Sequence, residues 1–312
     1  MSDFFKKIMY GDGGKKDFTV SDLPYTRKDV YKRLLRTQLN KLFLLNLWTL
    51  LFCLPFLCWS VLCLTYQSKF GETAEAEKQL VGFLVTVKYP LSIVFEAVSF
   101  IGFAGTAYVS RNLCWGMPTS VNRAFFRGVK LSVGQFIVLG IITSIAWCLF
   151  DFAFTALKFT DFDTWQLVFL YALLTFAIVL LCAGLMFAIN LCSTYRISTL
   201  SAIKNSFLLA VKYFWKSIGA LCVTVFPFIV LCGFNYLPLN LVAVFLFSIF
   251  GFVHVAVIWH LFTSFVFDYH INRENYPDFY RKGLAPISEE TPSIIKTEIK
   301  KTNSDTPEKG EE

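Results

Sequence analysis

Six long apolar runs, separated by short charged segments, constrain this chain more than any other feature. The runs lie at about 42–66, 86–110, 131–157, 165–191, 217–236 and 241–267. Each is long enough to cross a hydrocarbon core of about 30 Å as an α-helix that rises about 1.5 Å per residue. We therefore expect an all-α, polytopic transmembrane bundle of six spans.

The distribution of charge supports a membrane protein and excludes a separate catalytic domain. Charged residues make up 16% of the chain, whereas a soluble domain carries about 25%. We expect a basic cytoplasmic arm at 1–41, a membrane domain at 42–267 and a cytoplasmic tail at 268–312. The arm and the tail are each too short for a catalytic domain. From Gly283 the tail is polar with few aromatic residues, which predicts disorder.

The connections between the apolar runs predict the orientation. The connections 111–130 and 192–216 each carry four Lys or Arg residues and no acid, whereas 67–85, 158–164 and 237–240 carry acids or no charge. Basic residues stay on the cytoplasmic side of a membrane. We therefore expect a cell-membrane protein with both termini in the cytoplasm. The net charge of +7 belongs to these flanks, so it does not indicate nucleic-acid binding.

Three basic segments, at 26–41, 118–130 and 201–216, each place one apolar stripe along a helix. The stripes are Val30 and Leu34; Val121, Phe125 and Val129; and Ile203, Phe207 and Val211. We expect interfacial helices on the cytoplasmic side, with the stripes among acyl chains and the cations at anionic lipid headgroups. The expected lipid-interface residues are Arg123, Arg127, Lys130, Lys204, Lys212 and Lys216.

Two interpretations of these three basic segments are open. Each segment precedes a pair of spans, so the chain can be read as three repeats of an interfacial helix and a transmembrane hairpin. Short basic loops of any membrane protein produce similar segments. The first segment begins with Thr26-x-x-Asp29, a pattern typical of a helix N-terminus.

Residues 42–57 contain Leu45-Asn46-Leu47 followed by Leu50 and Leu54-Pro55. This stretch resembles the start of the YesL-like family, bacterial integral membrane proteins that share a domain of unknown function. The segment 123–135 is similar to the basic aromatic segment of that family. The chain departs from the family where Phe56-Leu57-Cys58 follows the proline and in the polar insertion at 67–85. The resemblance implies a role beside carbohydrate uptake, with a sugar-transporter subunit as partner, and it carries over no catalytic residue.

Three ionisable residues inside the spans form a candidate intramembrane polar site, namely Glu96, Asp151 and His254. Ionisable groups are costly in a bilayer and are therefore functional candidates. In the functional reading Glu96 titrates and His254 is its proton partner. In the structural reading each group is hydrogen-bonded to a neighbouring helix. His260 is expected near the inner boundary, with its ring tip exposed.

The neighbours of Glu96 favour the structural reading. The residues around it are mainly apolar, and we expect no row of polar side chains along its span. The pair Gly102-x-x-Gly105 favours close helix packing.

No pattern in the sequence predicts an enzyme. A phosphate-binding loop, a zinc helix and a hydrolase nucleophile elbow are all missing from it. The nine cysteines fall mostly in apolar runs as small hydrophobes, and no metal or cofactor is expected. The sequence favours a non-catalytic multi-pass membrane protein that is accessory to carbohydrate uptake. The alternative is a small transporter or channel built around Glu96 and His254.

The orientation is testable by cysteine labelling in a cysteine-free background. Single cysteines at Thr73 and Asp161 should react with an impermeant thiol reagent in intact cells, because both lie on predicted outer connections. Cysteines at Thr119 and Ser201 should stay unlabelled. Labelling at Thr119 without labelling at Thr73 would reverse the orientation.

Overall fold

The computed structural model describes residues 23–70, 74–233 and 237–286, and all regular structure in these ranges is helical. The α-helices are α2 (Arg27–Thr37), α3 (Leu39–Gln67), α4 (Ala74–Phe83), α5 (Tyr89–Cys114), α6 (Val121–Leu157), α7 (Thr164–Thr194), α8 (Thr199–Lys212), α9 (Phe214–Gly233), α10 (Leu237–Leu246), α11 (Phe252–Phe267) and α12 (Arg273–Asn275). Three π-helical turns, η2 (Leu84–Lys88), η3 (Phe247–Gly251) and η4 (Asp268–Asn272), and the 3₁₀ turn η5 (Pro277–Phe279) join some of them.

The predicted fold class is confirmed. Among the described residues, five helices are long and apolar enough to cross a membrane, and the number rises to six when α8 and α9, which meet at 95°, count together as one broken span. The chain is therefore an α-helical, multi-pass membrane protein.

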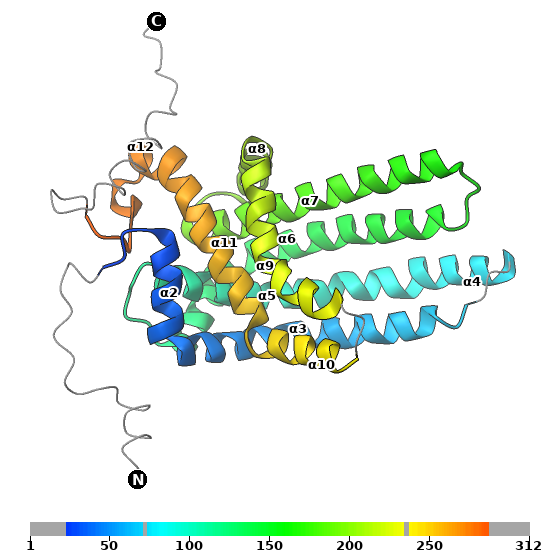
Figure 1. The fold of residues 1–312 in the computed structure, drawn as a ribbon, viewed down its shortest axis with the longest axis horizontal. Helices are drawn as coiled ribbons and strands as arrows, with labels where there is room; N and C mark the ends of the chain where they lie inside the picture. Colours follow the sequence, from blue (N-terminus) through cyan, green and yellow to red (C-terminus); the bar gives the residue numbers. More distant parts are fainter. Residues whose placement is uncertain (1–22, 71–73, 234–236, 287–312) are drawn as a thin grey trace, which may run out of the picture.

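Two long helical hairpins form the body of the bundle (Figure 1). The first joins α3 to α4 and α5, and the second joins α6 to α7. Helix α5 lies at the centre, since it contacts α3, α6, α7 and α11. Helix α11 crosses the hairpins obliquely, α2 lies at their left end, and α9 and α10 end partway along them.

The predicted interfacial helix at 118–130 is not a separate element. Helix α6 runs without a break from Val121, so this segment is its first three turns. Val121 and Phe125 are buried in the same apolar cluster as Val30 and Leu34 of α2. The prediction that these two stripes lie among acyl chains is therefore wrong, because an i, i+4 stripe can pack against protein as readily as against lipid.

Helix α8 keeps the expected character of an exposed amphipathic helix. Its small residues Ala202, Ser206 and Ala210 are buried against the bundle. Leu208 and Val211 point outward and are each 62% exposed, whereas Ile203 and Leu209 pack against the core. Immersion of this face in lipid remains a prediction. Of the three proposed repeats, the second lacks a break between its amphipathic segment and its first span.

The connection at 67–85, predicted as a polar loop, is largely helical. Helix α4 begins at Ala74 and continues through η2 into α5, so that Glu75–Cys114 is one helical run of 40 residues. The wide turn η2 ends two residues before Pro90, which has no N–H to donate to a helical ladder.

Both ends of the described part of the chain, α2 and residues 268–286, pack onto the bundle. The side chain of Thr26 accepts a hydrogen bond from the backbone N–H of Asp29, which confirms the expected cap of α2. The predicted solvated tail begins later than expected, because residues 268–286 fold against the bundle. The arm up to residue 22 and the tail from residue 287 lie outside the described residues.

Asn46 of α3 joins the first hairpin to α11. Its side chain is fully buried; its Nδ2 donates to the carbonyl of Ser248 at 2.6 Å, and its Oδ1 accepts from the N–H of Val253 at 3.1 Å. Both backbone groups lie at the π-turn η3, where the regular helical ladder is interrupted.

Gly102 and Gly105 lie at two close helix contacts. A Cβ atom at Gly102 would lie 2.5 Å from Cβ of Phe52 on α3, and one at Gly105 would lie 2.6 Å from the ring of Phe125 on α6. The absence of a side chain therefore lets α3 and α6 approach α5, as the sequence predicted.

Replacement of Gly105 by Ala should destabilise the bundle by about 1–3 kcal/mol, because the new methyl group collides with a buried ring. Gly134→Ala on α6 is the matched control, since nothing lies within 4 Å of its Cβ position. Thermal unfolding in detergent should show a lower Tm for Gly105→Ala alone. Equal Tm values for the two variants would contradict the packing.

Candidate functional site

The three predicted intramembrane residues are each held by a different partner. Oε2 of Glu96 on α5 accepts a hydrogen bond from the hydroxyl of Ser144 on α6 at 2.6 Å. Nδ1 of His254 on α11 lies 2.8 Å from the hydroxyl of Tyr31 on α2. Glu96 thus faces α6 and His254 faces α2, so the structure does not join them in one proton-transfer pair.

Asp151 is half of an ion pair that sequence reasoning missed. Its Oδ2 accepts from Nζ of Lys88 at 2.8 Å and from the hydroxyl of Tyr89 at 3.1 Å. Lys88 also lies 3.4 Å from Oε1 of Gln67. The cluster connects α3, η2, α5 and α6. A lysine at the outer end of the second predicted span was the available signal for it.

Polar side chains follow one face of α5 at helical spacing, contrary to the expectation from the immediate neighbours of Glu96. We call this row the α5 seam; its members are Ser92, Glu96, Ser99 and Thr106. Helix α3 supplies Trp59, which donates to Ser92 at 3.1 Å, and Thr49, whose hydroxyl lies 2.6 Å from that of Thr106. Hydrogen bonds of this kind hold membrane helices together. The spacing i, i+4, i+7 and i+14 was visible in the sequence.

His260 is fully buried, so the predicted exposed ring tip is wrong. Its Nδ1 lies 3.0 Å from Oδ1 of Asn190, whose Nδ2 donates to the carbonyl of Met186 at 2.8 Å. The amide oxygen therefore acts as the acceptor and Nδ1 as the donor. Nε2 then accepts from the hydroxyl of Ser264 at 3.2 Å. These contacts join α7 to α11 inside the bundle.

The most extensive polar contact ties α2 to the C-terminal segment, and we call it the terminal junction. Arg27 and Asp268 form a buried ion pair at 2.6 Å, with side chains 11% and 12% exposed. The other carboxylate oxygen accepts from Nδ2 of Asn272 at 2.8 Å and from the backbone N–H of Arg281 at 3.2 Å. The hydroxyl of Tyr195 donates to Oδ1 of Asn272 at 2.5 Å. Both carboxylate oxygens of Asp268 thus accept hydrogen bonds.

Burial shifts the acid–base equilibria around this junction. Burial is the main reason that the pKa of Tyr195 is raised, and the negative charge of Asp268 adds to the effect. Burial likewise lowers the pKa of Arg281 from its usual value. Both shifts disfavour the ionised form, which is the expected direction for groups removed from water.

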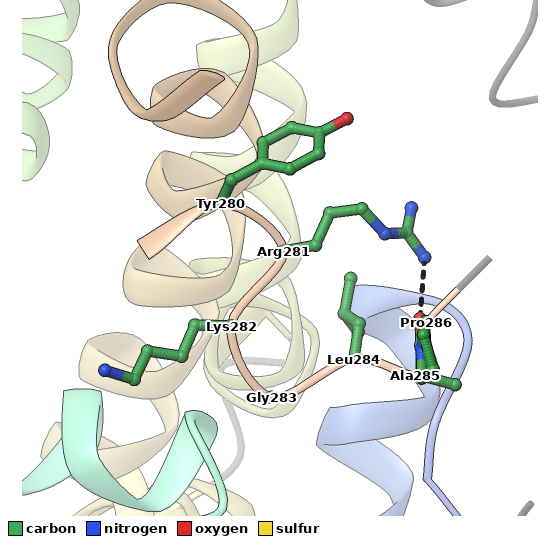
Figure 2. Close-up of a pocket in the computed structure, with 7 residues that line it drawn as sticks. All are labelled: Tyr280, Arg281, Lys282, Gly283, Leu284, Ala285 and Pro286. Atoms are coloured by element: carbon green, nitrogen blue, oxygen red, sulfur yellow. Dashed lines mark hydrogen bonds between the residues drawn. The ribbon is translucent and has the colours of Figure 1, made fainter. Parts of the chain in front are cut away.

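An open pocket lies over the segment from Tyr280 to Pro286 (Figure 2). Arg281 reaches across it and donates to the carbonyl of Ala285 at 3.3 Å. Gly283 has a φ of +84°, and a Cβ there would lie 2.5 Å from the carbonyl oxygen of Cys114. The N–H of Ala285 donates to the carbonyl of Pro24 at 3.0 Å, which fixes the segment between α2 and the end of α5.

Within the described ranges, no group of three or more His, Cys, Asp or Glu side chains is arranged to hold a metal ion. No family model, curated protein or solved structure matches the chain.

Asp268→Asn should lower the free energy of unfolding by about 3 kcal/mol, because it leaves the Arg27 charge buried without its carboxylate. Asp29→Asn is the matched control, since Asp29 and Lys32 lie 3.9 Å apart with side chains 44% and 68% exposed, and the amide oxygen can still accept from the hydroxyl of Thr26. Loss of that pair should cost about 0–1 kcal/mol. Thermal unfolding of both variants in detergent measures the difference, and equal losses would argue against a buried ion pair.

Proposed function

We propose that this protein is a non-catalytic membrane protein that works by binding another membrane protein, with its helical bundle as a scaffold. The observation that carries the proposal is the pairing of its intramembrane polar groups. Glu96 is bonded to Ser144, Asp151 to Lys88 and His254 to Tyr31, and each pair joins two helices. Such pairs stabilise helix packing.

A transporter makes a different demand on these groups. A carboxylate that carries protons must exchange its partner and reach water during each cycle. Glu96 is part of the α5 seam, whose Ser92 and Thr106 hydroxyls bond to α3 and whose carboxylate accepts from Ser144 of α6. Because these polar groups are bonded to other helices of the same bundle, a structural role for the seam is favoured.

The expected partner is a sugar-transporter subunit in the cell membrane. This step rests on the resemblance of residues 42–57 to the YesL-like family. Asn46 of that stretch is buried and bonded to Ser248 and Val253, so it has a role in the fold. The cytoplasmic location of both termini rests on the charge of the connections.

The second candidate function is a small transporter, and the α5 seam is the observation that favours it. A row of polar side chains with one carboxylate along a central helix is also the arrangement of a proton path. The two functions differ in whether Glu96 must titrate.

Glu96→Gln separates the two functions. Glutamine keeps the size of the side chain and an oxygen that can accept from Ser144, but it cannot titrate. Under our proposal this variant should restore the phenotype of a deletion strain as fully as the wild type. Glu96→Leu should lower the Tm, because it leaves the buried hydroxyl of Ser144 without its acceptor.

The Tm of each purified variant is the control for folding. A Gln variant with the Tm of the wild type that fails to restore the phenotype would overturn the scaffold role and favour the transporter. Extraction of the native membrane in polymer discs then tests the partner, which should copurify in a fixed ratio. A protein recovered alone in every preparation would contradict the accessory role.

A further inference from the structure

Three cations from distant parts of the chain gather around the turn between α5 and α6, and we call them the cation group. The guanidinium carbon of Arg111 lies 5.0 Å from the ring centroid of Trp115, and Nζ of Lys282 lies 4.8 Å from the same centroid. Nη2 of Arg33 lies 3.6 Å from the Cβ position of Gly116. All three side chains are half-buried.

The fold holds these cations in place from three sides. Leu34 of α2 is 1% exposed in the core, which sets the position of the adjacent Arg33. Arg111 belongs to the last turn of α5 and also stacks on Tyr108 at 4.5 Å. The close approach of Gly283 to Cys114 brings Lys282 over the indole ring.

No ion pair joins the cation group to a carboxylate in the part of the chain that the structure describes. Arg111 donates instead to the carbonyl of Ser193 and, at 3.4 Å, to Oδ1 of Asn112. Its Nε is buried without a hydrogen-bond partner among those residues. Asp268 is already engaged by Arg27, Asn272 and Arg281 in the terminal junction. Among the described residues, therefore, no carboxylate pairs with any of these three cations.

We propose that the cation group binds the phosphate of an anionic phospholipid headgroup. It lies at the end of the membrane-spanning helix α5, between α2 and the C-terminal segment, and basic pockets between transmembrane helices bind such headgroups. The planar fork of a guanidinium group matches the geometry of a phosphate. Trp115 provides the amphipathic ring that is typical of this depth of a membrane.

This site differs from the lipid-interface residues expected from the sequence. Those residues, Arg123, Arg127, Lys130, Lys204, Lys212 and Lys216, are all exposed along α6, along α8 and at the start of α9. Exposed cations attract anionic membranes by charge alone, whereas the cation group is built from three elements around one turn, Trp115–Gly116. The proposal therefore predicts binding of individual lipids, in addition to general attraction.

The test is a titration of the full-length protein in neutral detergent with phosphatidylglycerol, followed by native mass spectrometry. The double variant Arg33→Gln/Lys282→Gln should bind this lipid roughly 30-fold more weakly than the wild type, which is the effect of two lost cations near a membrane surface. The matched control is Lys28→Gln/Arg36→Gln, which removes two exposed cations of α2 and should bind within about twofold of the wild type.

Two further arms exclude misfolding and a soluble ligand. The charge-conserving variant Arg33→Lys/Lys282→Arg should retain most of the binding, whereas loss in this variant too would overturn a role for charge. If inorganic phosphate displaces the lipid and raises the Tm as much as the lipid does, the lipid assignment is overturned in favour of a soluble phosphate. Equal weakening in the two Gln double variants would overturn the site itself.

Discussion

A polar group inside a membrane must find its partner within the protein, and this constraint governs the bundle from Asn46 outward. The π-turn η3 leaves the carbonyl of Ser248 and the N–H of Val253 to be satisfied by a side chain, and one amide from α3 serves both. The first hairpin is thereby attached to the oblique helix α11. The same requirement explains the hydrogen bonds between Ser144 and Glu96 and between Asn190 and His260. Polar residues in this protein mark helix contacts as clearly as the glycines do.

The sequence was sufficient for the fold class and for five of the long helices, because hydropathy reports directly on transfer into lipid. The fifth expected span, 217–236, is the exception, since α9 is long and apolar enough only together with α8. The sequence was insufficient for the amphipathic segments. Val121 and Phe125 are buried against protein, whereas Val211 is exposed, although all three lie on similar stripes. An apolar stripe indicates only that one face of the helix is kept from water. Which surface covers that face depends on helices that lie far away in the sequence.

In the candidate site, too, the sequence identified individual residues but not the partners that lie far away in the sequence. Glu96 and Asp151 stand out because ionisable residues in apolar runs are rare. Their partners Ser144 and Lys88 could be assigned only after α5 and α6 were placed side by side. His260 was misjudged because its position near the end of a span suggested access to water. Asn190 on α7, Ser264 on α11 and the ring of Trp115 lie around its buried ring, and no spacing along α11 could indicate the two distant neighbours.

The terminal junction has a consequence for biosynthesis. Helix α2 precedes the membrane-spanning helices in the sequence, yet it is held by Asp268, by His254 and, through the preceding Pro24, by Ala285, which follow it by more than 200 residues. During translation α2 therefore lacks these contacts while the spans are being inserted. The junction can therefore close only after Asp268 and the segment up to Ala285 have been synthesised. A chain that stops before Asp268 would leave Arg27 without its carboxylate partner.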